Sequence, residues 1–205
     1  MRALTLAYLG VFVLAAISPH DRGDWLLENL LVAVAIPALA WGHRRLVLSN
    51  LSYLLIFAFL VLHAVGAHYT YSLTPPGFWV RDAFDLSRNP YDRFAHLCFG
   101  LLLGYPVREL VRRRLHLHGL AGYAIPVVLL LASSALYEIV EYQVARVVDP
   151  DAGIAFLGTQ GDEWDAQKDM AWAALGALLA MAGTALYRSR TGREPWGILA
   201  LREPV

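Results

Sequence analysis

Residues Gly119–Tyr137 form the sequence GLAGYAIPVVLLLASSALY, which contains no Asp, Glu, Lys, Arg or His. As a helix that rises about 1.5 Å per residue, these 19 residues extend over about 28 Å. That length is close to the ~30 Å thickness of the hydrocarbon core of a bilayer. This stretch therefore predicts a transmembrane helix.

Other uncharged runs extend the same pattern to both sides of this stretch, namely Ala3–Pro19, Asn29–Gly42, Leu46–Leu62, Leu97–Val107 and Met170–Tyr187. The second and fourth of these are long enough only if they begin near Trp25 and Tyr91, which places ionisable residues just inside one end of each helix. Lipid tolerates such residues where they face the bundle interior or water. We predict an all-α polytopic membrane bundle with six transmembrane helices, at about 3–18, 25–42, 46–67, 91–112, 119–146 and 166–187. A soluble all-α core is the alternative.

The composition agrees with a membrane protein. Of the 205 residues, 58% are hydrophobic and only 17% are charged, against about 25% charged in soluble domains. The formal net charge is zero, which argues against nucleic acid as a partner. Cys98 has no second cysteine for a disulfide, and the chain carries no nucleotide or pyridoxal phosphate motif. We expect one helical domain over 1–190 and a short cytoplasmic tail over 191–205.

The first apolar run has two interpretations. It follows Met1-Arg2 and ends in small residues, which is typical of a signal peptide, and cleavage would leave five transmembrane helices. No clean A-x-A cleavage site precedes the charged turn, so we favour an uncleaved anchor.

Basic and acidic residues separate across the predicted membrane. One side holds eleven Arg, including four between residues 108 and 114, whereas the other holds six Lys or Arg. The positive-inside rule then makes both termini cytoplasmic and places loops 19–24, 68–90 and 147–165 outside. Fourteen of the 17 acidic residues fall on the outer side, which that rule does not require.

Several outer acids and histidines recur at helical spacing near helix ends. Asp92 and His96 are four residues apart and share a helix face. Glu138 and Glu141 follow the uncharged run at the end of the fifth predicted helix, where negative charge opposes the helix dipole. The remaining members of the set are His63 and His68 at the end of the third helix and Asp162, Asp165 and Asp169 at the start of the sixth.

Carboxylates and imidazoles from facing helices form metal sites in helix bundles. We predict a divalent metal site with ligands drawn from His63, His96, Glu138, Glu141, Asp162, Asp165 and Asp169. Nitrogen and oxygen ligands without thiolate suit Zn, Mn or Fe(II), and Ca or Mg would suit carboxylates alone.

Each of these residues also has a structural interpretation. Asp92 and Asp162 are typical of acids in the first turn of a helix. The two histidines of the third helix fit interfacial hydrogen bonding. Glu138 and Glu141 would form salt bridges with Arg93, Arg146 or Lys168.

Four blocks resemble the YjdF family of bacterial inner-membrane proteins, a domain of unknown function. They are HAVGAHYTY over 63–71, YDRFAH over 91–96, YEIVE over 137–141 and, the most specific, LGTQGDEWDAQKD over 157–169. The second block is also weakly similar to VanZ-like membrane proteins. The resemblance implies a multi-pass inner-membrane protein and supplies no reaction.

Three functions fit these observations. The first is a metal-dependent hydrolase or transferase, with His68 or Asp92 as general base and a lipid or lipid-linked head group as substrate. The second is a cation or proton transporter or an ion-binding protein. The third is a structural membrane protein whose outer helix ends are held together by the cluster. Membrane lipids are the expected partners, and the oligomeric state is left open.

Overall fold

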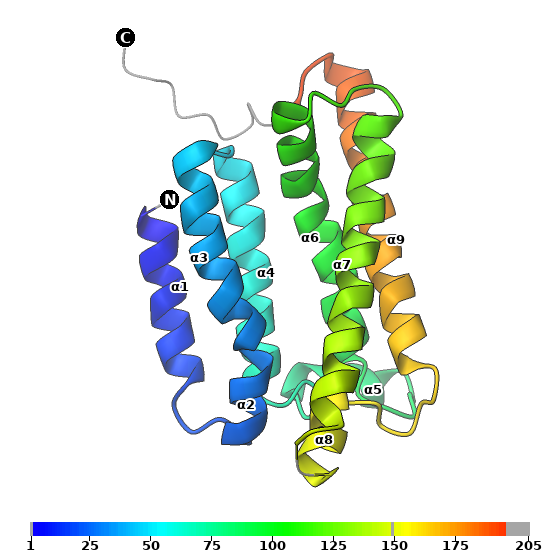
Figure 1. The fold of residues 1–205 in the computed structure, drawn as a ribbon. Helices are drawn as coiled ribbons and strands as arrows, with labels where there is room; N and C mark the ends of the chain where they lie inside the picture. The colour runs from blue at the N-terminus through cyan, green and yellow to red at the C-terminus, as the bar shows by residue number, and fades with distance from the viewer. Residues whose placement is uncertain (1, 149, 196–205) are drawn as a thin grey trace.

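The computed structural model describes residues 2–148 and 150–195, and the regular elements of this part of the chain are all helices. In chain order they are α1 (Arg2–Ala15), α2 (Arg22–Glu28), α3 (Leu30–Arg45), α4 (Asn50–His68), α5 (Pro75–Ala83), α6 (Tyr91–Arg114), α7 (Ala121–Ala145), α8 (Pro150–Leu157) and α9 (Asp165–Thr191) (Figure 1).

Five helical segments of the described chain are long and apolar enough to cross a membrane. They are Arg22–Arg45, Asn50–His68, Tyr91–Arg114, Ala121–Ala145 and Asp165–Thr191. The predicted helical membrane bundle is confirmed. The first predicted span is a shorter apolar helix, α1, whose 14 residues rise about 21 Å and end at Ala15. The second is divided into α2 and α3 at Asn29, whose side-chain amide donates to the carbonyl of Trp25.

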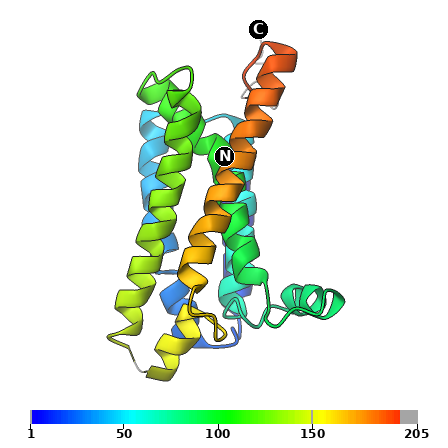
Figure 2. The same ribbon diagram turned by 90° about the vertical axis from the view of Figure 1, so that its right-hand side faces the viewer.

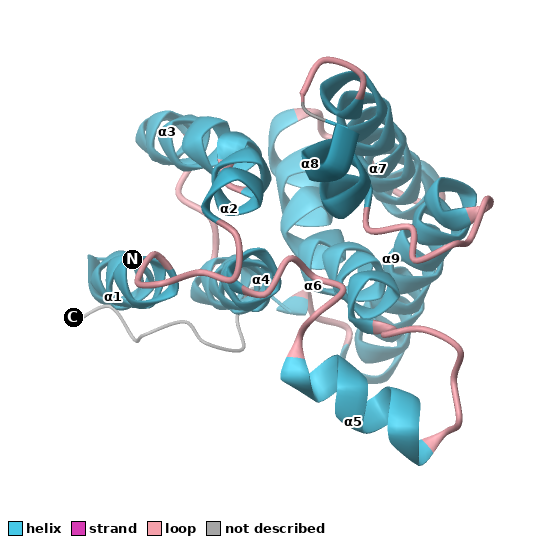
Figure 3. Cartoon of the chain, turned by 90° about the horizontal axis from the view of Figure 1, so that it is seen from below, coloured by secondary structure: helices cyan, strands magenta, loops and turns pink. Residues whose placement is uncertain are grey.

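The long helices form two groups that stand side by side, α1, α3 and α4 on one side and α6, α7 and α9 on the other (Figures 1 and 3). Packing between α4 and α6 joins the groups. The ends of α4 and α7 and the beginnings of α6 and α9 lie at the same end of the bundle (Figure 1). This arrangement brings the predicted site residues to one level, as the sequence indicates.

The closest helix pair is α6 and α9, and glycine makes it possible. A methyl group on Gly100 would lie 1.9 Å from the carbonyl oxygen of Ala173, and one on Gly176 would lie 2.0 Å from that of Leu97. Small residues allow helices in membranes to approach to backbone contact. The N-terminal turns of α6 and α9, which carry candidate ligands, are therefore held together.

Two short helices, α5 and α8, lie in the loops that were predicted to face outward, and the hydrophobic pattern did not predict them. Helix α5 projects away from the long helices (Figure 2). Its Trp79, and Phe84 directly after its last residue, are more than two-thirds exposed. An exposed aromatic helix at the end of a membrane bundle is typical of a helix that lies in the lipid interface.

At the opposite, Arg-rich end, the carboxylates of Glu109 and Glu194 are paired with arginines. Glu109 accepts hydrogen bonds from the side chains of Ser49 and Ser52 at 2.7 and 2.5 Å and forms a 2.6 Å salt bridge with Arg113. Glu194, in the predicted tail, forms salt bridges with Arg108, Arg112 and Arg188. The last ten residues of that tail, 196–205, lie outside the described residues.

Candidate metal centre

Three of the predicted site residues converge where α6 and α9 begin. Asp92 and His96 are one turn apart on α6, and Asp169 follows one turn after the start of α9. One ligand atom from each of the three lies within 4.8 Å of the others. Carboxylate oxygens and an imidazole nitrogen at this separation form a partial coordination sphere for a divalent cation.

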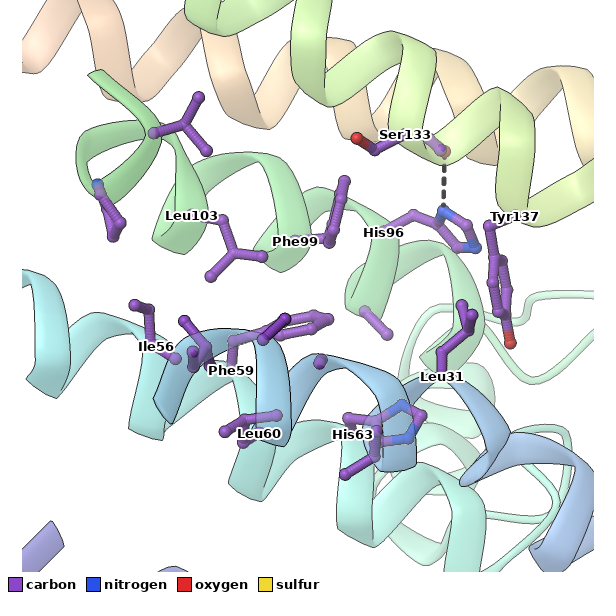
Figure 4. Close-up of a pocket in the computed structure, with 18 of the residues that line it drawn as sticks. Leu31, Ile56, Phe59, Leu60, His63, His96, Phe99, Leu103, Ser133 and Tyr137 are labelled. Carbon is purple, nitrogen blue, oxygen red and sulfur yellow. Dashed lines mark hydrogen bonds between the residues drawn. The ribbon is translucent and has the colours of Figure 1, made fainter. Parts of the chain in front are cut away.

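A hydrogen bond with a neighbouring helix orients the imidazole of His96. Its Nδ1 lies 3.3 Å from the hydroxyl of Ser134 on α7 (Figure 4). Its Nε2 points the other way, 3.7 Å from an oxygen of Asp92 and 3.5 Å from an oxygen of Glu138. A histidine whose second nitrogen is held by a hydrogen bond is the usual arrangement of a metal ligand.

Two of the carboxyl groups around His96 each leave one oxygen without a hydrogen-bond partner. Asp169 is 2% exposed and its Oδ1 has no hydrogen bond, and the same holds for the buried Oε1 of Glu138. In the part of the chain that the structure describes, no Lys or Arg forms a salt bridge with Glu138 or Glu141. The cations expected to do so are engaged elsewhere, since Arg93 and Lys168 bind Asp162 and Arg146 stacks on Tyr142.

Two further predicted ligands are paired with cations. Asp165 is buried against the guanidinium of Arg88, which also donates to the carbonyl of Thr159 at 3.1 Å. Asp162 accepts from Lys168 and Arg93. The hydrogen bond from Lys168, with the one from Arg93, lowers the pKa of Asp162 to about 2. Both aspartates thus attach the loop before α9 to its neighbours, and their role as ligands stays a prediction.

The two histidines of α4 lie apart from the group of Asp92, His96 and Asp169. His68 is 2.9 Å from the carbonyl of Ala15 and so connects α4 to α1. Nδ1 of His63 is 2.5 Å from the hydroxyl of Tyr71. The phenol can donate to this nitrogen or accept from it, depending on the tautomer of His63. In either tautomer, the buried Nε2 of His63 has no hydrogen-bond partner among the described residues.

A cavity of about 580 Å³ opens beside the group, between α3 and α4 on one side and α6 and α7 on the other. Asp92 and His96 line its polar end, together with Glu28, Glu141, His63, Tyr71 and Tyr137. Farther along, its walls are apolar, and Phe59 and Ile56 face Phe99 and Leu103 (Figure 4). Glu28 lies inside the second predicted helix, but the spacing of acids and histidines singled out neither Glu28 nor Tyr71 and Tyr137 as site residues. The only sign of Glu28 was its position as an isolated acid at the start of an apolar run.

These features define a class, the multi-pass helical membrane protein with a buried carboxylate–imidazole group at one end of its bundle. Comparison with known proteins identifies the family. Residues 1–190 match the family described as "Predicted membrane protein (DUF2238)", and the chain belongs to it. The chain is 39% identical over 193 residues to "Inner membrane protein YjdF" of Escherichia coli (strain K12), which covers 94% of this chain and 91% of that protein. No solved structure matches.

The family assignment confirms the YjdF resemblance and the multi-pass inner-membrane location. The orientation of the termini and the VanZ-like similarity stay predictions.

Proposed function

We propose that the protein is a divalent-metal-dependent membrane enzyme that hydrolyses or transfers the head group of a lipid. Asp92, His96 and Asp169 hold the ion, and Glu138, the next carboxylate to His96, accepts a proton from the attacking nucleophile.

One observation carries this proposal, the unpartnered carboxyl oxygens of Asp169 and Glu138 beside an imidazole that Ser134 orients. A buried polar atom without a partner costs free energy, and a buried charge costs more. At the Arg-rich end Glu109 and Glu194 are paired with arginines, so the unpartnered carboxyl oxygens of the described residues, which include those of Asp24, gather at the opposite end of the bundle. A cation bound between Asp92, His96 and Asp169 supplies the missing partner.

The position of Asp92, His96 and Asp169 beside the cavity favours a catalytic role over a structural one. Two of the three residues, Asp92 and His96, line the cavity, so a molecule in the cavity reaches the ion. A divalent ion lowers the pKa of bound water and stabilises negative charge on a substrate oxygen. In hydrolysis of the head group, the water oxygen would bond to the phosphorus as the P–O bond to the departing oxygen breaks. Glu138 would accept the proton of the water and return it to the departing oxygen.

The apolar middle of the cavity favours an enzyme over a cation transporter. Between His96 and the far end at His43 and Tyr53, the walls carry Leu, Ile, Phe, Val and Ala side chains. Such walls offer no ligands to an ion in transit, whereas they accommodate a hydrocarbon chain.

Metal content of the purified protein tests the proposal. The protein in nonionic detergent is expected to hold one divalent ion per chain, by elemental analysis or by titration after chelation. Asp92→Asn and Asp169→Asn should each lose it, whereas Glu163→Gln, which removes an exposed acid near the start of α9, should retain it. Metal-dependent release of head groups from added lipids is the second readout. A parent protein that binds no divalent ion near neutral pH would refute the proposal.

A further inference from the structure

The polar end of the cavity carries two carboxyl groups that do not belong to the metal group beside them. They are those of Glu28 and Glu141, which line the cavity and are 5% and 8% exposed. Tyr137, one turn before Glu141 on α7, donates to Glu28 at 3.1 Å. Among the described residues, those that line the cavity include no Lys or Arg. Besides Asp92, this end therefore presents two buried carboxyl groups and no Lys or Arg side chain to a molecule in the cavity.

A second observation at this end points to a ligand. Nε2 of His63 is buried, has no hydrogen-bond partner and belongs to a residue that is 92% buried and lines the cavity (Figure 4). The hydrogen bond with Tyr71 occupies Nδ1 and leaves Nε2 unmatched in either tautomer. Native proteins rarely leave a buried polar atom unmatched. A polar atom of a bound head group would pair with Nε2.

The apolar part of the cavity has the dimensions of a lipid tail. From His96 to Leu110 along α6 the lining spans 15 residues, whose 14 steps of 1.5 Å give a rise of about 21 Å, roughly two-thirds of the ~30 Å hydrocarbon core. In the described part of the chain, α3 packs on α2 but makes no extensive contact with α6 or α7. The side of the cavity between α3 and the second helix group is thus the least firmly closed.

From these features we infer that the cavity binds a single-chain lipid whose head group carries an ammonium. The chain lies along Phe59, Phe99 and Leu103, and the ammonium lies between Glu28 and Glu141, beside the rings of Tyr71 and Tyr137. Carboxylates and aromatic faces are the groups that recognise an ammonium cation. The cation also supplies the charge compensation that two buried carboxylates require. This inference rests on the proposed function for its reaction and names the substrate class.

Two lysophospholipids with the same acyl chain test the ammonium preference. Lysophosphatidylethanolamine carries an ammonium and lysophosphatidylglycerol does not. In nonionic detergent, by native mass spectrometry or competition, the parent is expected to bind the first at least ~10-fold more tightly, the equivalent of 1.4 kcal/mol. The double variant Glu28→Gln/Glu141→Gln should lose this preference, and Glu163→Gln should keep it. Equal binding of the two lipids by the parent, or a preference that survives in the double variant, overturns the inference.

A second pair of variants tests the tail and does not depend on folding of the double variant. Ala35→Trp places a large ring on the cavity wall, whereas Ala33→Trp places it at an exposed position of the same helix that does not line the cavity. Ala35→Trp should weaken binding of lysophosphatidylethanolamine at least ~10-fold, with Ala33→Trp unchanged. Unchanged binding in Ala35→Trp contradicts the inference.

Repeating the comparison after chelation separates the two proposals. Glu28 and Glu141 do not belong to the group of Asp92, His96 and Asp169, so the ammonium preference should persist in metal-free protein. An ammonium preference in a protein that binds no metal would refute the proposed enzyme and support the lipid site. Metal binding without an ammonium preference would support the metal centre and refute the lipid site.

Discussion

At the residue scale, the properties of each acid depend on its partner. Asp165 and Asp169 are one turn apart on α9, and both are buried. Asp165 faces Arg88, whereas Asp169 leaves one oxygen unpaired among Asp92 and Glu138. Asp165 therefore stabilises the fold through its salt bridge, and Asp169 is the better candidate for metal binding.

Ser134→Ala is expected to weaken metal binding without abolishing it. The substitution removes the hydroxyl that orients His96, and loss of such a partner typically costs 10–100-fold in metal affinity. Ser133→Ala is the matched control, because Ser133 is exposed and donates to the carbonyl of Leu129. Titration calorimetry of the two variants measures the difference, and equal affinities would remove Ser134 from the site.

Asp169→Asn should have opposite effects on stability with and without metal. In metal-free protein the neutral amide relieves crowding of carboxylates, which we expect to stabilise the fold by about 1 kcal/mol and raise the melting temperature by roughly 2–4 °C. The parent should gain about 2.7 kcal/mol at a metal concentration of 100 times Kd, and the variant should gain nothing. Thermal unfolding with and without metal checks both signs. A metal-dependent rise that persists in Asp169→Asn would contradict the assignment.

At the element scale, the site depends on how closely α6 approaches α9 and on the loop that leads into α9. Backbone contact at Gly100 and Gly176 determines how closely the two helices approach. Salt bridges hold the loop before α9 in place, and they connect Arg88, Arg93 and Lys168 to Asp165 and Asp162. Neither set includes a metal ligand of the proposed centre, yet both position Asp169 against Asp92 and His96.

Gly176→Ala is expected to destabilise the protein and to impair metal binding. Its methyl group would collide with the backbone of α6, and overpacking of this kind typically costs about 1–3 kcal/mol. Gly183→Ala is the control on the same helix, because nothing lies within 4 Å of a methyl group there, and alanine favours helix by up to about 1 kcal/mol. Thermal unfolding in detergent distinguishes the two, and equal stability would show that the close contact is dispensable.

The Asp162 salt bridges predict a pH dependence. Because the folded-state pKa of Asp162 is lowered to about 2, the ionised carboxylate stabilises the fold above its ordinary pKa near 4. This contribution is lost as the pH falls through the window between about 4 and 2. Asp162→Asn should therefore melt below the parent at pH 6, and the difference should shrink toward pH 3. A difference that does not vary with pH would exclude the charge as its cause.

At the scale of the whole molecule, the net charge is zero although basic and acidic residues lie at opposite ends of the bundle. At the Arg-rich end, Glu109 and Glu194 are the counter-ions of the arginines. The carboxylates that lack cationic partners lie at the opposite end. The positive-inside rule predicts that the basic end lies in the cytoplasm, and on this prediction the metal group and the polar end of the cavity open toward the outside.

Cysteine labelling tests this orientation. In a Cys98→Ser background, Asp85→Cys and Ser189→Cys are both exposed positions at opposite ends of the bundle. A membrane-impermeant maleimide is expected to label Asp85→Cys in intact cells and Ser189→Cys only after the membrane is opened. Labelling of Ser189→Cys but not Asp85→Cys in intact cells would show that the orientation is the opposite of the predicted one.

Hydropathy and spacing were enough to predict the long helices and the level at which their acids gather. Long uncharged runs have few alternatives to a membrane helix, because lipid requires every backbone polar group to be satisfied within the helix. The pairs Asp92/His96 and Glu138/Glu141 share helix faces by periodicity alone. Helices α5 and α8 carried no comparable pattern, since short interfacial helices need only one apolar face.

The sequence by itself thus determined the class of protein, its helices and the end of the bundle that holds its acids. Only the tertiary structure decided that Asp169 joins Asp92 and His96 while Asp165 pairs with Arg88, and that Glu28 shares a cavity with Glu141. Periodicity places a residue on a face of its own helix, but which helix that face meets depends on close packing between residues far apart in the chain, such as Gly100 and Gly176.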